Sequence, residues 1–374
     1  MTTLETIPFA DLRQLHAGLE ARFASVWDEV CRTSSFIGGP YVDAFEAEWA
    51  AYVGTDHAVG LANGTDAIAL ALTALGIGPG DEVLVPANTF IATAEAVAMA
   101  GARPRFVDVD ATSLLVTPEN CAPALSPRTA AVIVVHLYGH VADMTAMTAF
   151  ARQHGLALIE DAAQAHGATW EGRRVGTFGA VGAFSFYPGK NLGAFGDAGA
   201  VVTNDAAVAA KIRSLSNHGR SDEDRYVHPH RGVNSRLDSL QAGVLSIKLS
   251  MLDSWTESRR QVAACYREAL AGLGLRPPEP GPDSGSVWHL YVVRVAERER
   301  VRALLARSGV ETGIHYPVPC HRQAAFADLP VEDLPAAEAA AATVLSLPFH
   351  PGLTRGSVER VADVLRDALD SHGD

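Results

Sequence analysis

Residues 182–204 read GAFSFYPGKNLGAFGDAGAVVTN and hold one lysine, Lys190, among small and aromatic residues. Residues 183–187 lead into this lysine as a strand-like segment, and residues 198–203 lead out of it as another. Lysine is strongly hydrated, so placing it in an apolar hairpin-like turn is costly unless it is paired or deprotonated. A solvated surface turn is the commoner setting for such a lysine. The alternative is an amine whose pKa burial has lowered, so that it forms an imine with an aldehyde cofactor.

The chain around this turn alternates strands and helices. Apolar strands are predicted at 58–62, 83–86, 105–109, 130–135 and 156–160, with helices at 67–75, 91–100 and 144–154. Apolar strands that alternate with helices are typical of a mainly parallel sheet covered on both faces, and such sheets bind ligands at the carboxyl ends of their strands. The sequence therefore predicts an α/β fold with a mainly parallel sheet sandwiched by helices.

The two ends of the chain are predicted to be richer in helix. Helices are expected at 12–33, 41–53, 206–215, 237–272 (with one interruption), 297–308 and 357–369, and strands at 288–295 and near 312–316. The proline-rich run RPPEPGP at 276–282 marks a boundary. We predict a large cofactor-binding domain over residues 1–250, with an N-terminal helical segment, and a small C-terminal α/β domain with its linking helix over residues 251–374.

The composition limits the classes of function. The chain is 48% hydrophobic and 20% charged, its formal net charge is −13, and it has no basic cluster of the kind that binds nucleic acid. No segment approaches the about 18 uninterrupted apolar residues of a membrane helix, and the start MTTLETIPFADLRQ lacks the features of a signal peptide. The four cysteines are widely spaced, as in a reducing compartment: Cys31, Cys121, Cys265 and Cys320. We expect a cytoplasmic protein that binds neither nucleic acid nor membrane.

Other residues fit the needs of pyridoxal phosphate. This cofactor requires an amine, a carboxylate facing its pyridine nitrogen, donors for its phosphate and a flat cover for its ring. Lys190 is the candidate amine. Asp161 is the candidate carboxylate, because it ends an apolar strand, where a buried charge needs a partner such as a protonated ring nitrogen. Gln164, three residues later, is placed to reach the phenolic oxygen O3′.

The phosphate donors are expected at the start of helix 67–75. Unpaired N–H groups and the helix dipole favour an anion there, which selects Gly64 and Thr65, although Thr65 or Asp66 also suits a plain helix cap. Ser185, on the strand before the lysine, adds a hydroxyl group, and Phe90 is the candidate ring cover. Each of these residues taken singly has a common structural role, but together with the lysine and the carboxylate they favour a cofactor site.

Competing motifs fail on their spacing. A nucleotide phosphate loop needs glycine where Phe184 stands and serine or threonine where Asn191 stands. The glycines at 193, 196 and 199 do not form the dinucleotide fingerprint. His136 and His140 have HxxxH spacing but no glutamate between them, so no metal site is predicted.

With these residues in view, the chain resembles the DegT/DnrJ/StrS-type sugar aminotransferases, which are fold type I pyridoxal phosphate enzymes. The resemblance covers nearly the whole chain through the blocks FIGGPYVDAFEAEWAAYVG, ANGTDAIALAL, GPGDEVLVPANTFIAT, VHLYG, IEDAAQAHGA, SFYPGKNLGAFGDAGAVVTND, VNSRLDSLQAGVL, HYPVPCH and LSLPFHP, in this order. The nearest likeness is to enzymes that install the 3-amino group of dTDP-linked deoxysugars in antibiotic pathways. Family members that dehydrate sugars have histidine at the position of Lys190, so this lysine favours amino transfer.

The resemblance implies a role for each candidate. Lys190 would hold the cofactor as an imine and then act as the base of the proton shift. L-Glutamate would convert the cofactor to pyridoxamine 5′-phosphate, and dTDP-3-keto-6-deoxyhexose would receive the amino group. Asn234 would reach the phosphate of the neighbouring subunit, which implies a homodimer with shared active sites. The remaining contacts would be the pyridinium, O3′ and phosphate partners already named: Asp161, Gln164, Gly64, Thr65 and Ser185.

The sugar nucleotide is expected to meet residues of the polar loop 217–232 and of the small domain. The candidates are His218, Arg220, Arg225, Tyr226 and Arg231 from the loop, and His315, Tyr316 and His321 from the small domain. Taken singly, each is more often a solvated or structural residue. Other acceptors remain open, namely a C-4 keto-sugar nucleotide, a keto-cyclitol or an amino-benzoate precursor. The alternative of a different class is a regulatory protein that keeps the fold and cofactor without turnover.

Overall fold

The computed structural model describes residues 6–221, 223–275, 277–279, 281–330 and 333–370. Its centre is a seven-stranded sheet with the order β1-β9-β8-β5-β4-β2-β3. The strands are β1 (His57–Leu61), β2 (Glu82–Pro86), β3 (Arg103–Val107), β4 (Thr129–Val135), β5 (Ala157–Asp161), β8 (Val181–Ser185) and β9 (Gly199–Thr203). Only β9 runs antiparallel to its neighbours in this sheet, and the other pairs are parallel. The predicted mainly parallel sheet is confirmed.

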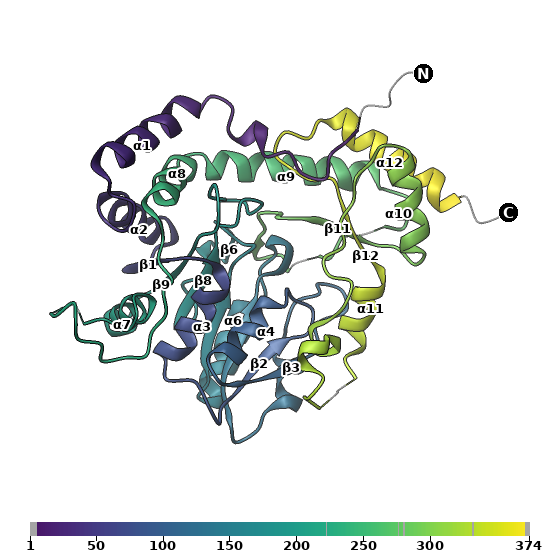
Figure 1. Ribbon diagram of the computed structural model, residues 1–374. Helices are drawn as coiled ribbons and strands as arrows, with labels where there is room; N and C mark the ends of the chain where they lie inside the picture. The colour runs from purple at the N-terminus through teal and green to yellow at the C-terminus, as the bar shows by residue number, and fades with distance from the viewer. Residues whose placement is uncertain (1–5, 222, 276, 280, 331–332, 371–374) are drawn as a thin grey trace.

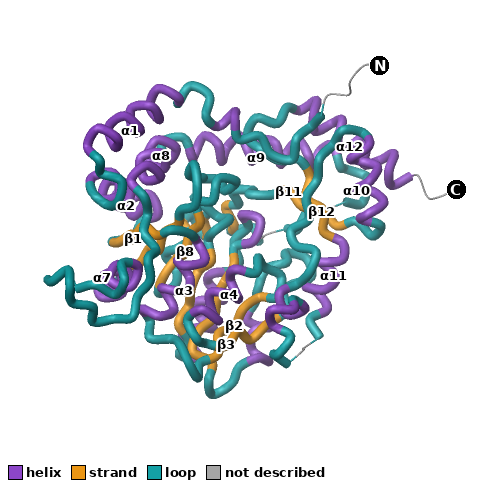
Figure 2. The backbone as a smooth tube through the Cα atoms, viewed as in Figure 1, coloured by secondary structure: helices purple, strands orange, loops and turns teal. Residues whose placement is uncertain are grey.

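Helices cover this sheet, as Figures 1 and 2 show. Around it lie α2 (Pro40–Val53), α3 (Gly64–Ala74), α4 (Ala92–Met99), α5 (Pro118–Cys121), α6 (Met144–His154) and α7 (Ala206–Ser216). α3 packs against β1, β8 and β9, whereas α6 packs against β4 and β5. Strand side chains such as Val83, Leu84 and Ile133 are fully buried between the layers, which explains why these strands are apolar at successive positions. Within the described ranges, no helix combines the length and apolar character that a membrane span needs.

The N-terminal helix is shorter than predicted. Residues 12–33 were expected to form one helix, but α1 covers Glu20–Thr33 and is preceded by a short 3-10 turn, η1 (Arg13–Leu15). Gly18 between them has φ +82°, a left-handed conformation that an α-helix does not contain. The predicted apolar face remains, because Leu15, Leu19 and Val26 are buried.

The C-terminal part contains α8 (Ser239–Leu249), α9 (Leu252–Ala269), β11 (Tyr291–Arg294), α10 (Arg298–Arg307), α11 (Pro335–Thr343), β12 (Val344–Leu347) and α12 (Arg355–Asp370). β11 and β12 form an antiparallel pair. The strand predicted near 312–316 is wrong, because β12 is the partner of β11 and the segment keeps only one bridge, between Gly313 and Ser346. β12 itself was not predicted.

Buried apolar side chains gather in two large clusters. One surrounds the seven-stranded sheet, and the other lies among α9, β11, α10, β12 and α12. The first cluster also includes side chains from beyond residue 250, such as Val287, Leu290 and Phe326. The domain boundary at residue 250 stays a prediction, and of the proline-rich run, residues 276 and 280 lie outside the described ranges.

Candidate active site

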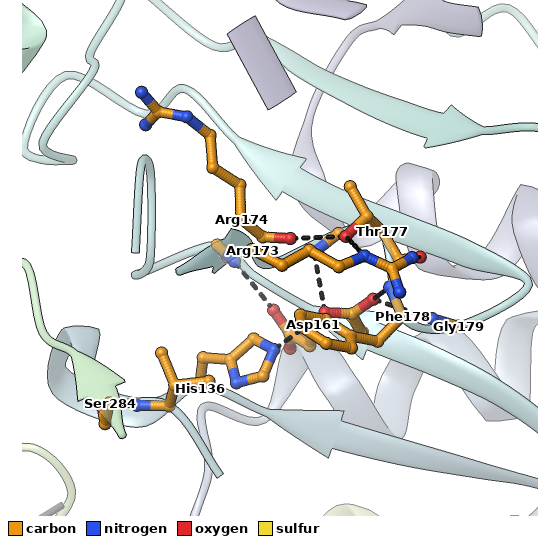
Figure 3. Close-up of polar contacts among 12 residues, drawn as sticks. His136, Asp161, Arg173, Arg174, Thr177, Phe178, Gly179 and Ser284 are labelled. Atoms are coloured by element: carbon orange, nitrogen blue, oxygen red, sulfur yellow. Dashed lines mark hydrogen bonds and ion pairs between the residues drawn. The ribbon is translucent and has the colours of Figure 1, made fainter. Parts of the chain in front are cut away.

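The two central residues of the predicted cofactor site, Asp161 and Lys190, lie at the end of one strand and after the end of another, at the carboxyl edge of the sheet. Asp161 is the last residue of β5, and its carbonyl accepts a hydrogen bond from the N–H of His136, which follows β4, at 3.1 Å (Figure 3). Lys190 lies in the connection between the antiparallel strands β8 and β9, as the hairpin-like pattern predicted. Parallel strands end at one edge of a sheet, so these connections lie where such folds place their ligands.

The carboxylate of Asp161 is buried and held on both oxygens. Oδ2 accepts a hydrogen bond from the hydroxyl of Thr93 at 2.8 Å, and Oδ1 accepts one from the N–H of Ala163 at 3.2 Å. Only 6% of Asp161 is exposed. A buried carboxylate with two neutral donors is short of a positive partner, which is the condition that a protonated pyridine nitrogen satisfies.

Lys190 has an amine suited to imine formation. The backbone N–H of Lys190 donates to the carbonyl of Tyr187 at 2.8 Å, which closes the turn. The next residue, Asn191, is buried and donates from Nδ2 to the carbonyl of Val287 at 3.1 Å. Burial lowers the pKa of Lys190 to about 8, and the nearby charge of Asp161 acts in the opposite direction. The lysine and the carboxylate are therefore close enough to interact, and the lysine is partly neutral near neutral pH.

This lowered pKa predicts how the cofactor associates with the apo-protein. At pH 7 about a tenth of an amine with a pKa near 8 is neutral, and neutral amine is the form that attacks an aldehyde. The rate of pyridoxal phosphate association, followed by stopped-flow absorbance, should rise about tenfold between pH 7 and pH 9 and then level off. In Asp161→Asn the midpoint should move to lower pH, since the carboxylate charge raises the lysine pKa. A rate that keeps rising beyond pH 10 contradicts the lowered pKa.

The start of α3 forms a cradle beside Ser185. The predicted cap by Thr65 or Asp66 is wrong, because Asn63 is the N-cap and its Oδ1 accepts from the N–H of Asp66 at 2.8 Å. Gly64 and Thr65 therefore stand in the first helical turn, where N–H groups lack acceptors within the helix. A Cβ atom on Gly64 would lie 2.6 Å from Cβ of Ser185, so the strand and the helix start meet only because this residue is glycine. Gly64, at the start of the helix, therefore lies directly against Ser185, and the phosphate prediction named both residues.

The cradle yields a prediction with a matched control. Gly64→Ala should weaken pyridoxal phosphate binding at least about tenfold, because the added methyl group displaces Ser185 and the N–H groups that would bind the phosphate. Gly356→Ala is the control, since Gly356 also lies in the first turn of a helix, α12, and a Cβ there meets nothing within 4 Å. Equilibrium titration of both apo-proteins measures the difference. Equal affinities would exclude the cradle from the site.

Gln164 is held in one orientation of its amide group. Its Oε1 accepts from the N–H of Tyr138 at 2.7 Å, and its Nε2 donates to the hydroxyl of Tyr316 at 3.1 Å. Tyr138 has φ 61°, a conformation that non-glycine residues adopt rarely. Because the oxygen is used by Tyr138, the NH₂ group of Gln164 is the part left to meet O3′. The ring of Phe90 is half exposed and lies 5.4 Å from that of Tyr316.

The two histidines predicted from the small domain have different positions. Nδ1 of His315 forms a hydrogen bond with the hydroxyl of Ser346 at 2.8 Å. Burial, together with the smaller effect of the Lys190 charge, lowers the pKa of His315 to about 4. His315 therefore belongs near the lysine. His321 is buried, and its Nε2 lies 3.0 Å from Oε1 of Glu338, which engages it away from the other site residues.

Loop 217–232 projects from the body of the subunit beyond α7 (Figure 1). The predicted contacts that it carries are exposed: His218, Arg220, Arg225, Tyr226 and Arg231. Asn234 is exposed as well and forms a bridge with Asn217. Within one chain the structure does not bring these residues to Lys190. Their roles stay predictions that depend on a second subunit.

Sequence patterns did not reveal several polar residues around the site. Thr93 binds Asp161 as described, and His166 donates from Nε2 to the carbonyl of Ser185 at 2.8 Å. Nδ1 of His289 lies 3.1 Å from Oδ1 of Asn191. The only sequence signal of Thr93 and His166 was a position inside the quoted blocks, and His289 lies outside those blocks. None of the three shows a spacing that points to an active site.

A buried glutamate next to Asp161 shapes the loop that precedes β8. Glu160 accepts from the N–H groups of Gly176, Phe178 and Gly179 at 2.7, 2.7 and 2.9 Å. His136 lies 3.2 Å from the same carboxylate, whereas His140 lies 2.9 Å from the hydroxyl of Ser286. The two histidines of the HxxxH spacing therefore have different partners.

Comparison with known proteins places the chain in a family. Residues 19–366 match the DegT/DnrJ/EryC1/StrS aminotransferase family. The chain belongs to this family. It is 48% identical to dTDP-3-amino-3,4,6-trideoxy-alpha-D-glucose transaminase of Streptomyces venezuelae, over 96% of either chain. It is 47% identical to the erythromycin biosynthesis sensory transduction protein EryC1 of Saccharopolyspora erythraea, over 96% of this chain and 99% of that one.

The fold agrees with this membership. The crystal structure of S. venezuelae DesV in complex with ketimine intermediate superposes with a TM-score of 0.94 at 47% identity, and the match covers 99% of this chain and 100% of that one. The family and the fold class that the sequence predicted are both confirmed. The chain is therefore an aminotransferase, as the sequence predicted.

Proposed function

We propose that this protein is a pyridoxal 5′-phosphate-dependent aminotransferase that moves the amino group of L-glutamate to a nucleotide-linked keto sugar, dTDP-3-keto-6-deoxyhexose. The observation that carries the proposal is the lowered pKa of Lys190 within electrostatic reach of the buried Asp161. The name of the Streptomyces venezuelae relative, a 3-amino-sugar transaminase, supports the choice of sugar and of carbon C-3.

The residues present fit this cofactor. Asp161, whose charge acts on Lys190, would pair with the pyridine nitrogen, while the NH₂ group of Gln164 would meet O3′. The glycine cradle at Gly64, with Thr65 and Ser185, would hold the phosphate. The half-exposed ring of Phe90, beside Tyr316, is the cover that the sequence predicted. These residues support the proposal, because together they would meet each need of the cofactor.

The chemistry divides between the cofactor and the protein. When bound, pyridoxal 5′-phosphate supplies an aldehyde that exchanges nitrogen with amines, a pyridoxamine form that stores the nitrogen and a ring that withdraws electrons. Lys190 moves protons at Nζ, and its pKa near 8 suits a general base at neutral pH. Asp161 would accept a hydrogen bond from the protonated ring nitrogen and so keep the proton on that nitrogen. Burial keeps the Tyr316 hydroxyl protonated by raising its pKa, so this group is a donor at the mouth of the site.

The proposed homodimer rests on residues that one chain leaves unused. Asn234 and the loop residues His218, Arg220, Arg225, Tyr226 and Arg231 are exposed and lie outside the chain's own cluster of site residues. We propose that they complete the site of the partner subunit, with Asn234 at the phosphate and Arg220 and Arg231 at the pyrophosphate of the substrate. Arginine suits such phosphate contacts because its guanidinium donates in a planar fork.

Mixing two inactive variants tests the shared site. Lys190→Ala removes the lysine of a site, and Asn234→Asp would place a negative charge at the phosphate of the partner's site. If the variants exchange subunits freely, about half of the dimers are hybrids with one intact site, so the mixture should recover about a quarter of wild-type activity. The same two variants mixed without subunit exchange serve as the control. Absence of recovery, with hybrids verified by mass spectrometry, contradicts the shared site.

The reaction is tested by incubating the holoenzyme with L-glutamate and a panel of keto substrates. Mass spectrometry should find the amino product from the 3-keto deoxysugar nucleotide, and NMR should place nitrogen on C-3. Initial-rate plots should give parallel lines, because both half-reactions use one site in turn. Preferred amination of a C-4 keto sugar, a keto-cyclitol or an amino-benzoate precursor would replace the proposed acceptor, and intersecting lines would contradict the alternating mechanism.

A cytoplasmic location is also proposed, supported by four unpaired cysteines.

A further inference from the structure

Two buried threonines form a hydroxyl chain that ends on Asp161. Oγ1 of Thr93 lies 2.8 Å from Oδ2 of Asp161, and Oγ1 of Thr89 lies 2.9 Å from Oγ1 of Thr93. Thr89 is 3% exposed and Thr93 is 1% exposed, so water does not replace these contacts. Buried hydroxyl groups are costly unless they are hydrogen-bonded, and here they bond to each other and to the carboxylate.

The chemistry of the acceptor fixes the direction of this chain. An ionised carboxylate only accepts hydrogen bonds, so Thr93 donates its proton to Asp161. The oxygen of Thr93 is then free to accept, and Thr89 donates to it. The hydrogen bond to the carboxylate is charge-assisted, which makes it stronger than a bond between neutral groups.

The chain also joins separate elements. Thr93 lies in α4, which follows β2, while Asp161 ends β5, and β4 separates these two strands in the sheet. With Oδ1 held by the N–H of Ala163, the carboxylate is fixed from two directions. Each oxygen has one donor from the protein and keeps a lone pair for another.

We propose that Thr93, held by Thr89, is a positioning residue that keeps the carboxylate of Asp161 aimed at the pyridine nitrogen of the cofactor. This inference rests on the proposed function, since it requires the cofactor to bind at Asp161. It predicts an effect specific to that nitrogen. A residue that only supports the fold would affect every cofactor-shaped ligand alike.

The test compares two ligands, pyridoxal 5′-phosphate and its 1-deaza analogue, in which carbon replaces the ring nitrogen. Thr93→Val keeps the shape of the side chain and removes the donor, so apo-protein affinity for pyridoxal phosphate should fall about tenfold. Affinity for the analogue should stay unchanged, and Thr93→Ser should restore the wild-type preference. Thr256→Val is the control, because Thr256 is 5% exposed and its hydroxyl has no partner in the described part of the chain.

The outcomes separate this inference from the function on which it rests. Equal weakening of both ligands in Thr93→Val, or no weakening of either, overturns the positioning role while leaving the cofactor site intact. A wild-type protein that does not bind pyridoxal phosphate more tightly than the analogue overturns the pairing of Asp161 with the ring nitrogen, and with it both proposals. Thermal melting of each apo-variant, measured in parallel, shows whether Thr93→Val is folded. If it is not, Thr89→Val provides the same comparison one step further from the carboxylate.

Discussion

Replacing Lys190 with alanine is expected to lower kcat by about 10³-fold or more, because the change removes both the amine that holds the cofactor and the base that moves the proton. Rapid-quench measurement of each half-reaction, with L-glutamate and with the keto sugar, should show that both are slowed. Phosphate and ring contacts remain in the variant, so pyridoxal phosphate should still bind, but without covalent attachment.

Lys211→Ala is the control for this experiment. Lys211 lies in α7, away from the carboxyl edge of the sheet where Lys190 and Asp161 meet, so its loss should leave kcat within about twofold of wild type. A Lys190→Ala enzyme that retained full activity would contradict the assignment of the base.

Asp161→Asn is expected to weaken pyridoxal phosphate binding about 10²- to 10³-fold, since removing one member of a buried charge pair costs about 3–5 kcal/mol. The amide matches the carboxylate in size and still accepts from Thr93, so the loss reports the charge. The apo-variant should be no less stable than wild type, because without cofactor the buried carboxylate lacks a full cationic partner. Titration calorimetry and thermal melting together test both expectations.

Asp110→Asn gives the opposite pattern and serves as the control. Asp110 accepts from the N–H groups of Thr112 and Ser113 at 3.0 and 2.7 Å, and these turn contacts contribute to a lowered pKa. Its substitution should destabilise the apo-protein by about 1 kcal/mol and leave cofactor affinity unchanged. If Asp161→Asn bound the cofactor as tightly as wild type, Asp161 would not be the partner of the ring nitrogen.

The sheet and its site-bearing edge were predictable from local pattern. Strands buried on both faces must be apolar at successive positions, so a run such as AAVIVV at 130–135 identifies β4 and orders the elements around it. The glycine and the charged residues that stand at strand ends then predicted that Gly64, Asp161 and Lys190 lie at one edge of the sheet. These predictions depend on chemistry that each residue carries whatever its partners are.

The parts that sequence could not supply depend on contacts between distant segments. Thr93 meets Asp161 because the start of α4 lies beside the end of β5, and no sequence spacing of a threonine indicates such a hydrogen bond. Asn63 and Thr65 both suit a cap, and only the backbone conformation decides between them. β12 was missed because its four residues follow an alanine-rich helix without a turn signal. Asn234 and loop 217–232 need a second subunit to gain a role.

The most direct test of the central claim is to find which lysine carries the cofactor. The chain contains three lysines, Lys190, Lys211 and Lys248, and borohydride reduces a lysine imine to a stable amine. Lys248 is the stringent internal comparison, because burial lowers its pKa to about 8 as well, but its Nζ donates to the carbonyl of Gly193 at 2.6 Å. After reduction of the holoenzyme and peptide mass spectrometry, the phosphopyridoxyl mass should lie on Lys190 alone. A label on Lys248 or Lys211, or no label, would contradict the account.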